Sequence, residues 1–350
     1  MTNDKVFNHF KIHTQYSICQ GAIKIDDLAS HCKNSKTQSI GICDSFNLCG
    51  ALEFSEKISK SGTHPIIGTE INFLLHGVMG KLPLFATSQK GYKSLIKLSS
   101  KSYLETDEKS DPQCELIELI NFRSDLVLLS GNHQGLFGKL FKLNKLKQIE
   151  ETFKKLKEVF KDKFYLEIQR HNDSGEEAYE NYLIDISGKL EIPLIASQEI
   201  FYLNKDMYEA HDALTCIGEK TFVDDIKRER LNNQHYLKNN NELIKLYNDI
   251  PEALENNYNF PLRFNFKPKK SAPILPSIQT NKNMSVEAEL LNQAKLGLKN
   301  RLENFIYKKN TNKNTEDIIK NYEKRLFHEL NIINSMNYSS YFLIVSDYIR

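Results

Sequence analysis

Residues 39–73 read SIGICDSFNLCGALEFSEKISKSGTHPIIGTEINF and contain the alternation that decides the fold. Isoleucine alternates with small residues over 39–43, and a second apolar run spans 65–73, so both segments are predicted strands. Between them, Phe54 and Ile58 lie on one face of a helix predicted over 50–60. A strand, a helix and a second strand in this order form a βαβ unit, whose two strands pair in parallel.

The same alternation continues on both sides of this unit. We therefore predict an α/β fold with a mostly parallel sheet, either closed or doubly wound. The other expected strands are 7–12, 81–86, 125–130, 164–169 and 192–196, and the other expected helices are 25–32, 91–100, 146–161 and 179–190.

A change of pattern marks a boundary at residues 256–285. This stretch carries prolines and basic residues but no acid, which is typical of an extended connection between domains. After it the pattern is purely helical, with a polar low-complexity loop over 307–314. The final run, YFLIVSDYIR at 341–350, is apolar and has no terminal cap, as expected of a fragment of a longer protein. We predict domains at 1–275 and 276–350.

Composition excludes several classes of protein. The chain has 350 residues, of which 40% are hydrophobic, so it is not a disordered chain. Its 47 basic and 45 acidic residues nearly balance, which excludes a highly charged nucleic-acid tail. Six cysteines without a C-x-x-C pair argue against a disulfide framework and a cysteine-rich zinc site. With no signal peptide and no run near the about 18 apolar residues of a membrane span, we expect a cytoplasmic protein with no membrane partner.

Polar side chains follow several of the expected strands. In a barrel or an α/β sheet the carboxyl ends of the strands converge on one face, so these side chains are candidates for a shared site. Imidazoles and carboxylates together would suit Zn, Mn or Fe and phosphoester chemistry. The alternatives are solvated loop residues or a hydrogen-bonded polar layer. The candidates are His9, His13, Asp44, Glu70, Glu167, His171 and Glu199.

The other histidines stand alone in the sequence. For an isolated histidine, a capping, packing or surface role is commoner than metal ligation. We therefore expect structural roles for His64, His76, His133, His211, His235 and His328.

Eight stretches resemble, in order, the N-terminal part of bacterial DNA polymerase III alpha subunits. That part is a PHP (polymerase and histidinol phosphatase) domain followed by the start of the palm region. The resemblance implies a PHP-type distorted (β/α) barrel over 1–275 and, over 276–350, a linker and helical segment leading into the polymerase palm. The stretches are 7–28 (FNHFKIHTQYSICQGAIKIDDL), 40–73, 91–100 (GYKSLIKLSS), 126–135 (LVLLSGNHQG), 164–187, 192–217, 235–257 and 337–350 (NYSSYFLIVSDYIR).

Departures from the family pattern fall on its metal ligands. The His-x-His of the metal-binding form is Lys11 and His13 here, and the His before LPLFA is Lys81. An ammonium repels a cation and offers no lone pair when charged, but it can pair with Asp44, Glu70 or Glu167. The seven candidate residues would thus form a vestigial site without metal. The other departures are Gln20 for Asp, Asp44-Ser45 for Asp-His, and Gln198-Glu199-Ile200-Phe201 for Asn-Asp-x-His.

The resemblance implies template-directed DNA synthesis by the full-length protein, with Mg²⁺ held by carboxylates beyond Arg350. This chain would then hold no catalytic residue and no cofactor, and would be inactive alone. Its PHP domain would be a scaffold that docks the proofreading exonuclease (epsilon) subunit. A sliding clamp, a clamp loader and a primed DNA template would be partners of the whole protein. The alternatives are a metal-dependent PHP phosphoesterase or 3′–5′ exonuclease, and an interaction module without chemistry.

Overall fold

The computed structural model describes residues 5–107, 110–225, 227–274, 276, 278, 284–306 and 315–349. The chain divides into two compact units, Met1–Lys270 and Ser271–Arg350, and the division falls a little before the predicted boundary at 275. Each unit is described by itself.

The first unit is built on one curved sheet. Among the described residues the sheet has nine strands in the order β8-β7-β6-β4-β3-β2-β1-β9, with β5 paired to β3. Only β4 runs antiparallel to its neighbours. The two end strands β8 and β9 are separated in the chain only by Ser197 and Gln198, so the sheet curls until its ends meet as a distorted barrel. The strands are β1 Lys11–Ile12, β2 Ser39–Ser45, β3 His64–Leu75, β4 Val78–Ala86, β5 Gln113–Glu115, β6 Leu126–Leu129, β7 Phe164–Ile168, β8 Leu194–Ala196 and β9 Glu199–Ile200.

A two-residue turn reverses the chain between β3 and β4. His76 and Gly77 both have positive φ, 51° and 76°, as a tight hairpin matched to the strand twist requires. Because β4 is antiparallel, Lys81 lies near the same end of the barrel as Glu70 of β3, and the charged atoms of the two residues are 3.4 Å apart.

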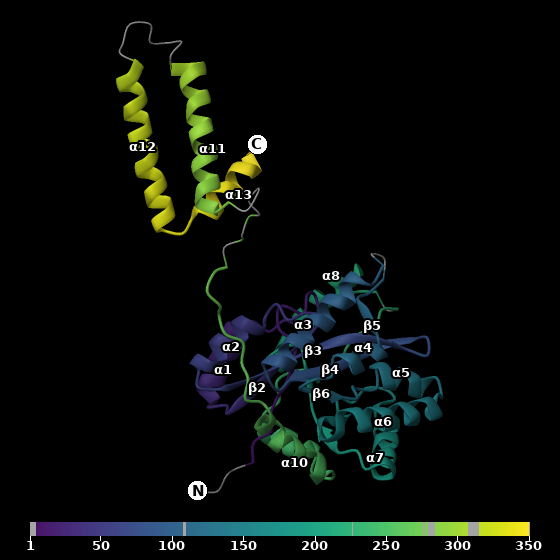
Figure 1. Cartoon of the computed structure of the whole chain (residues 1–350). Coiled ribbons are helices and arrows are strands. Elements are labelled where there is room, and N and C mark those ends of the chain that lie inside the picture. The colour runs from purple at the N-terminus through teal and green to yellow at the C-terminus, as the bar shows by residue number, and fades with distance from the viewer. Residues whose placement is uncertain are drawn as a thin grey trace. The chain divides into compact units, whose positions relative to one another are not determined.

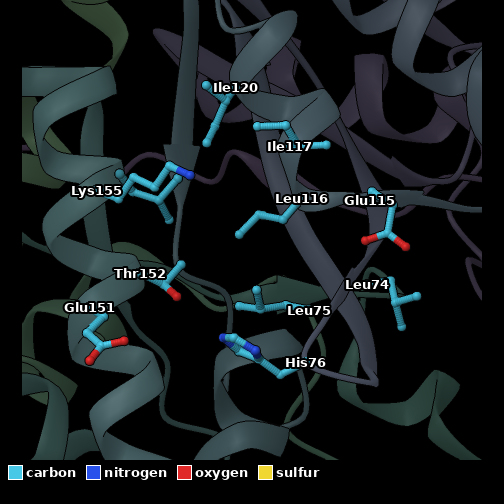
Figure 2. A pocket seen from close by; sticks show the side chains of 11 residues that line it. Leu74, Leu75, His76, Glu115, Leu116, Ile117, Ile120, Glu151, Thr152 and Lys155 are labelled. Carbon is cyan, nitrogen blue, oxygen red and sulfur yellow. The ribbon is translucent and has the colours of Figure 1, made fainter.

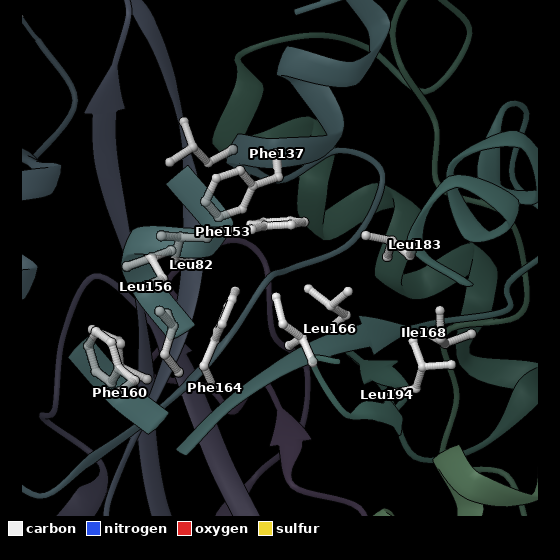
Figure 3. Packing of buried hydrophobic residues seen from close by; sticks show 14 of the residues in the cluster. Leu82, Phe137, Phe153, Leu156, Phe160, Phe164, Leu166, Ile168, Leu183 and Leu194 are labelled. Carbon is white, nitrogen blue, oxygen red and sulfur yellow. The ribbon is translucent and has the colours of Figure 1, made fainter. Parts of the chain in front are cut away.

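Helices cover the outer face of this sheet (Figure 1). Figure 3 shows how Phe153 and Leu156 of α6 pack with Phe137 of α5 against Phe164 and Leu166 of β7. This packing follows from the helical spacing of apolar residues along α6, whose buried residues are Ile149, Phe153, Leu156 and Phe160 among others. The helices are α1 Ile25–Ser35, α2 Ala51–Lys60, α3 Gln89–Leu104, α4 Leu116–Asn121, α5 Leu136–Lys142, α6 Leu146–Phe160, α7 Glu176–Leu190, α8 Tyr208–Glu219, α9 Asn240–Leu246 and α10 Pro251–Asn259.

The inner face of the sheet changes character along each strand. In β3 the buried Ile66 and the buried Glu70 are four residues apart and lie on the same face of the strand. In β7 the buried Tyr165 and Glu167 are two residues apart and also share a face. Successive inward residues therefore form an apolar layer at the amino ends of the parallel strands and a charged layer at their carboxyl ends. The apolar layer contains Phe10, Cys43, Ile66, Phe85, Val127, Leu129, Tyr165 and Ile195, together with Phe260 and Phe264 from the segment after α10.

The expected α/β barrel is confirmed, with differences in detail. The strand expected over 7–12 is reduced to β1, although Phe7 and Phe10 are buried. Two features were not predicted. β4 begins at Val78 and not at Lys81, and the sheet has an additional short strand, β5. β5 has only three residues, too few to show a period, and its pairing with the end of β3 is a tertiary contact.

The described part of the second unit from residue 286 onward is mostly helical. It consists of α11 Val286–Arg301, a π-helical turn Leu302–Ile306, α12 Thr315–Ser335 and α13 Ser339–Ile349. α11 and α12 run alongside each other (Figure 1), and Leu290, Leu330 and Leu343 form their shared core with α13. The polar loop expected at 307–314 lies outside the described residues. No helix in the described part of the chain combines the length and hydropathy that a membrane crossing requires.

Candidate functional site

The charged layer of the barrel is centred on a buried lysine. Lys11 is 1% exposed, and its Nζ lies 2.8 Å from Glu70 Oε1, 3.5 Å from Glu199 Oε1 and 3.8 Å from Glu167 Oε2. The parallel pairing of β1 with β9 places Lys11 opposite Glu199. The three carboxylates come from strands far apart in the chain and share one ammonium group.

Attraction between Lys11 and the surrounding carboxylates determines which groups of this cluster are ionised. Burial alone lowers the pKa of a lysine, but Glu167, Glu199 and Glu70 outweigh it and raise the pKa of Lys11 well above its usual value. Burial opposes ionisation of Glu199 as well, yet Lys11 and His13 hold the pKa of Glu199 well below its usual value. We conclude that Lys11 and Glu199 are a charged pair at neutral pH.

A second lysine and a histidine complete the cluster. Lys81 Nζ lies 3.4 Å from Glu70 Oε2 and donates to Ser45 Oγ at 3.0 Å. His13 Nε2 lies 3.0 Å from Glu199 Oε1, and the His13 ring stacks on Phe201. The positions that depart from the family pattern therefore meet in space. They are Lys11, Gln20, Ser45, Lys81 and Phe201.

These residues do not fit the metal cluster of the PHP family. His13, Glu70 and Glu199 offer ligand atoms within 4.8 Å of one another. However, two ammonium groups already face the same carboxylates, and a dication placed there would meet two like charges in a buried site. Lys11 Nζ lies 2.8 Å from Glu70 Oε1 and 3.5 Å from Glu199 Oε1, and both residues would be needed as metal ligands.

Three of the candidate residues lie outside this charge cluster. Asp44 accepts hydrogen bonds from Thr14 N at 2.6 Å and Ser17 Oγ at 2.7 Å, so it holds the loop after β1 and does not pair with either lysine. His9 donates from Nε2 to the carbonyl of Lys238 at 3.0 Å. His171 follows β7 and stacks on His235, with 4.1 Å between ring centroids.

Sequence reasoning missed several members of the polar layer. Asn132, in the loop after β6, donates to Glu199 Oε2 at 2.7 Å, and Gln169 donates to Glu167 Oε1 at 2.8 Å. His133 and His235, which the sequence marks as isolated, both approach Asp173. Gln169 directly follows β7, two residues after Glu167, so the period of the strand could have placed it on the same face. Nothing near His235 in the sequence signals its position.

Two hollows differ in chemistry. A cavity of about 750 Å³ opens over the charged layer and is lined by Lys11, Lys81, Glu70 and Glu199 among others. A separate hollow of about 370 Å³ lies between the end of β3, α4 and α6 (Figure 2), and it shares no lining residue with the first. Leu75, Leu116 and Ile117 line the second hollow beside the polar Glu151 and Lys155, whereas the buried charge cluster lines the first.

The chain folds as a distorted α/β barrel followed by helices, and parts of it match two family models. Residues 9–171 match the model of the PHP domain, and residues 289–350 match that of the bacterial DNA polymerase III alpha NTPase domain. Among solved structures, an amidohydrolase from Chromobacterium violaceum aligns with a TM-score of 0.37 and 8% identity, covering 60% of this chain and 96% of that chain. That similarity is too low to carry an argument.

Similar curated proteins are DNA polymerase III alpha subunits. The chain is 35% identical over 98% of its length to that of Caulobacter vibrioides, 34% over 98% to that of Rickettsia bellii and 34% over 98% to that of Borreliella burgdorferi. It spans 30%, 29% and 30% of those proteins. The chain is therefore homologous to the N-terminal part of bacterial DNA polymerase III alpha subunits, as its motifs indicate.

Proposed function

We propose that this chain is the N-terminal part of a replicative DNA polymerase III alpha subunit that carries out template-directed DNA synthesis as the full-length protein. The observation that carries the proposal is the 35% identity over 98% of the chain to a protein of that name. In this proposal the carboxylates that hold Mg²⁺ for nucleotidyl transfer lie beyond Arg350. The whole protein acts in the cytoplasm on primed DNA with a sliding clamp and a clamp loader.

Within that protein, the PHP domain is proposed to act as a scaffold. The charge cluster around Lys11 supports this role, because it fills the inner face of the barrel with ion pairs where a phosphoesterase needs open coordination sites. A barrel held together in this way offers its outer surfaces for docking. The partner proposed for them is the proofreading exonuclease (epsilon) subunit.

The first test is activity. The purified chain is expected to release no nucleotide from the 3′ end of single-stranded or primed DNA in Mn²⁺, Zn²⁺ or Mg²⁺, because Lys11 and Lys81 block the cluster that would activate water. Release of labelled nucleotide would be followed beside an active exonuclease as the positive control. Robust release that disappears in His13→Ala would contradict the scaffold proposal and favour a metal-dependent PHP phosphoesterase or 3′–5′ exonuclease.

The second test is binding. The chain is expected to form a 1:1 complex with the proofreading exonuclease subunit of the same organism, measured by isothermal titration and by co-elution in gel filtration. The control is Lys81→Met, which changes a partly exposed member of the cluster and should leave the complex intact. Lys11 is not used for this control because it is buried. Absence of any complex at micromolar concentration would contradict the docking role.

A further inference from the structure

A second group of ligand atoms lies beside the Lys11 cluster. His171 and Asp173 belong to the loop after β7, and His235 belongs to the segment before α9. One ligand atom from each of the three lies within 4.8 Å of the other two. We propose that these residues form a binding site for Zn²⁺ or a similar borderline dication, which links the loop after β7 to the segment before α9.

The surroundings of the two rings favour a lone pair on the same nitrogen. His235 donates from Nδ1 to the backbone carbonyl of Glu199 at 3.1 Å, so its Nε2 carries the lone pair. His171 Nδ1 lies 3.5 Å from Glu176 Oε1, and a carboxylate oxygen at that distance favours the proton on Nδ1. A carbonyl or carboxylate behind the far nitrogen is the usual way in which a protein orients a metal-binding histidine.

Those two Nε2 atoms are buried and have no hydrogen-bond partner. The side chains are only 2% (His171) and 3% (His235) exposed, so water does not readily replace the missing partner. A buried polar atom without a partner is costly, and ligation would remove that cost.

Asp173 supplies the negative charge. Its Oδ1 accepts from Asn232 Nδ2 at 2.6 Å, which fixes the carboxylate, while Oδ2 lies 3.9 Å from His235 Nε2 and 4.0 Å from His133 Nε2. Among the described residues no lysine or arginine forms an ion pair with Asp173, in contrast to the carboxylates around Lys11. The Asp173 carboxylate can therefore bind a cation.

The donor set suits zinc. Two imidazole nitrogens and one carboxylate oxygen, with His133 or water as a fourth ligand, match the nitrogen and oxygen ligands of tetrahedral Zn²⁺. Asp173, His133 and His235 line the cavity of about 750 Å³, which gives an ion a route in. The rings of His171 and His235 are 9° from parallel, so ligation requires them to tilt until both lone pairs converge.

The experiment is a titration of the metal-free 350-residue chain with Co²⁺, whose visible absorption reports low coordination by nitrogen and oxygen. One equivalent is expected to give a saturable band that Zn²⁺ displaces, and Zn²⁺ is expected to raise the melting temperature. Asp173→Asn and His235→Phe should each weaken binding by about tenfold or more and abolish the Zn²⁺-dependent rise. His328→Asn, which removes an exposed histidine in α12, is the matched control and should bind as the unmodified chain does.

Asp173→Asn preserves the shape of the side chain, and circular dichroism in the far ultraviolet would verify that both variants fold. Absence of a saturable band in the unmodified chain would overturn the proposal. So would a band that persists in Asp173→Asn and His235→Phe but is lost in His13→Asn, since that result would place the metal in the Lys11 cluster.

Discussion

Replacing Lys11 with methionine is expected to lower the free energy of unfolding by about 3–5 kcal/mol, because it removes one partner of a buried ion cluster and leaves carboxylates uncompensated. Lys11 is 1% exposed and faces Glu70, Glu167 and Glu199. Methionine lacks only the terminal nitrogen of the lysine side chain, so the loss reflects mainly charge and not a cavity. Urea denaturation at pH 7, followed by circular dichroism, measures the difference.

A double variant separates the charge effect from a packing effect. Lys11→Met combined with Glu70→Gln removes one of the stranded charges, so the double variant should be more stable than the single one. Lys81→Met is the matched control: the Lys81 side chain is 30% exposed, so its removal should cost much less. A loss below about 1 kcal/mol for Lys11→Met would show that the buried charges are not coupled as the distances indicate.

The cluster illustrates what the sequence can predict. Alternation along β3 and β7 puts Glu70 and Glu167 on the inner face, and the resemblance places Lys11 among expected ligands; the structure brings these three together. Asp44 was expected among them, yet it lies on the opposite face of β2 from Ser45. The two-residue period of a strand already contains that information, because neighbours in a strand point to opposite sides.

Other parts of the site depend on contacts that no local pattern carries. His235 meets His171 only because the segment before α9 returns to the open end of the barrel, where His235 donates to the carbonyl of Glu199. An isolated histidine in a sequence looks the same whether it ends on the surface or beside another histidine. The outer core is different: the helix over 146–161 was predicted, and the buried Phe153 and Leu156 lie three residues apart on one face of it, which is a local pattern.

Replacing Phe260 with alanine is expected to cost about 3–5 kcal/mol, the range for a large-to-small change at a buried aromatic residue. Phe260 is 1% exposed and closes the apolar layer of the barrel. Its ring lies 4.3 Å from that of Phe10, 5.5 Å from that of Phe85 and 4.9 Å from that of Phe264, measured between centroids. Tyr165 of β7 also packs on this ring, so β4, β7, the residue before β1 and the segment after α10 all lose contact with it.

The adjacent Leu262 provides the control for this prediction. It is apolar and belongs to the same short helical segment, but it is 78% exposed, so Leu262→Ala should change stability by no more than about 0.5 kcal/mol. Both variants would be compared by urea denaturation. Equal losses of stability in the two variants would mean that the whole segment after α10 stabilises the barrel, and not the Phe260 ring in particular. A large loss for Phe260→Ala alone would mean that the barrel interior needs this ring, because the strands cannot collapse onto the space that it leaves.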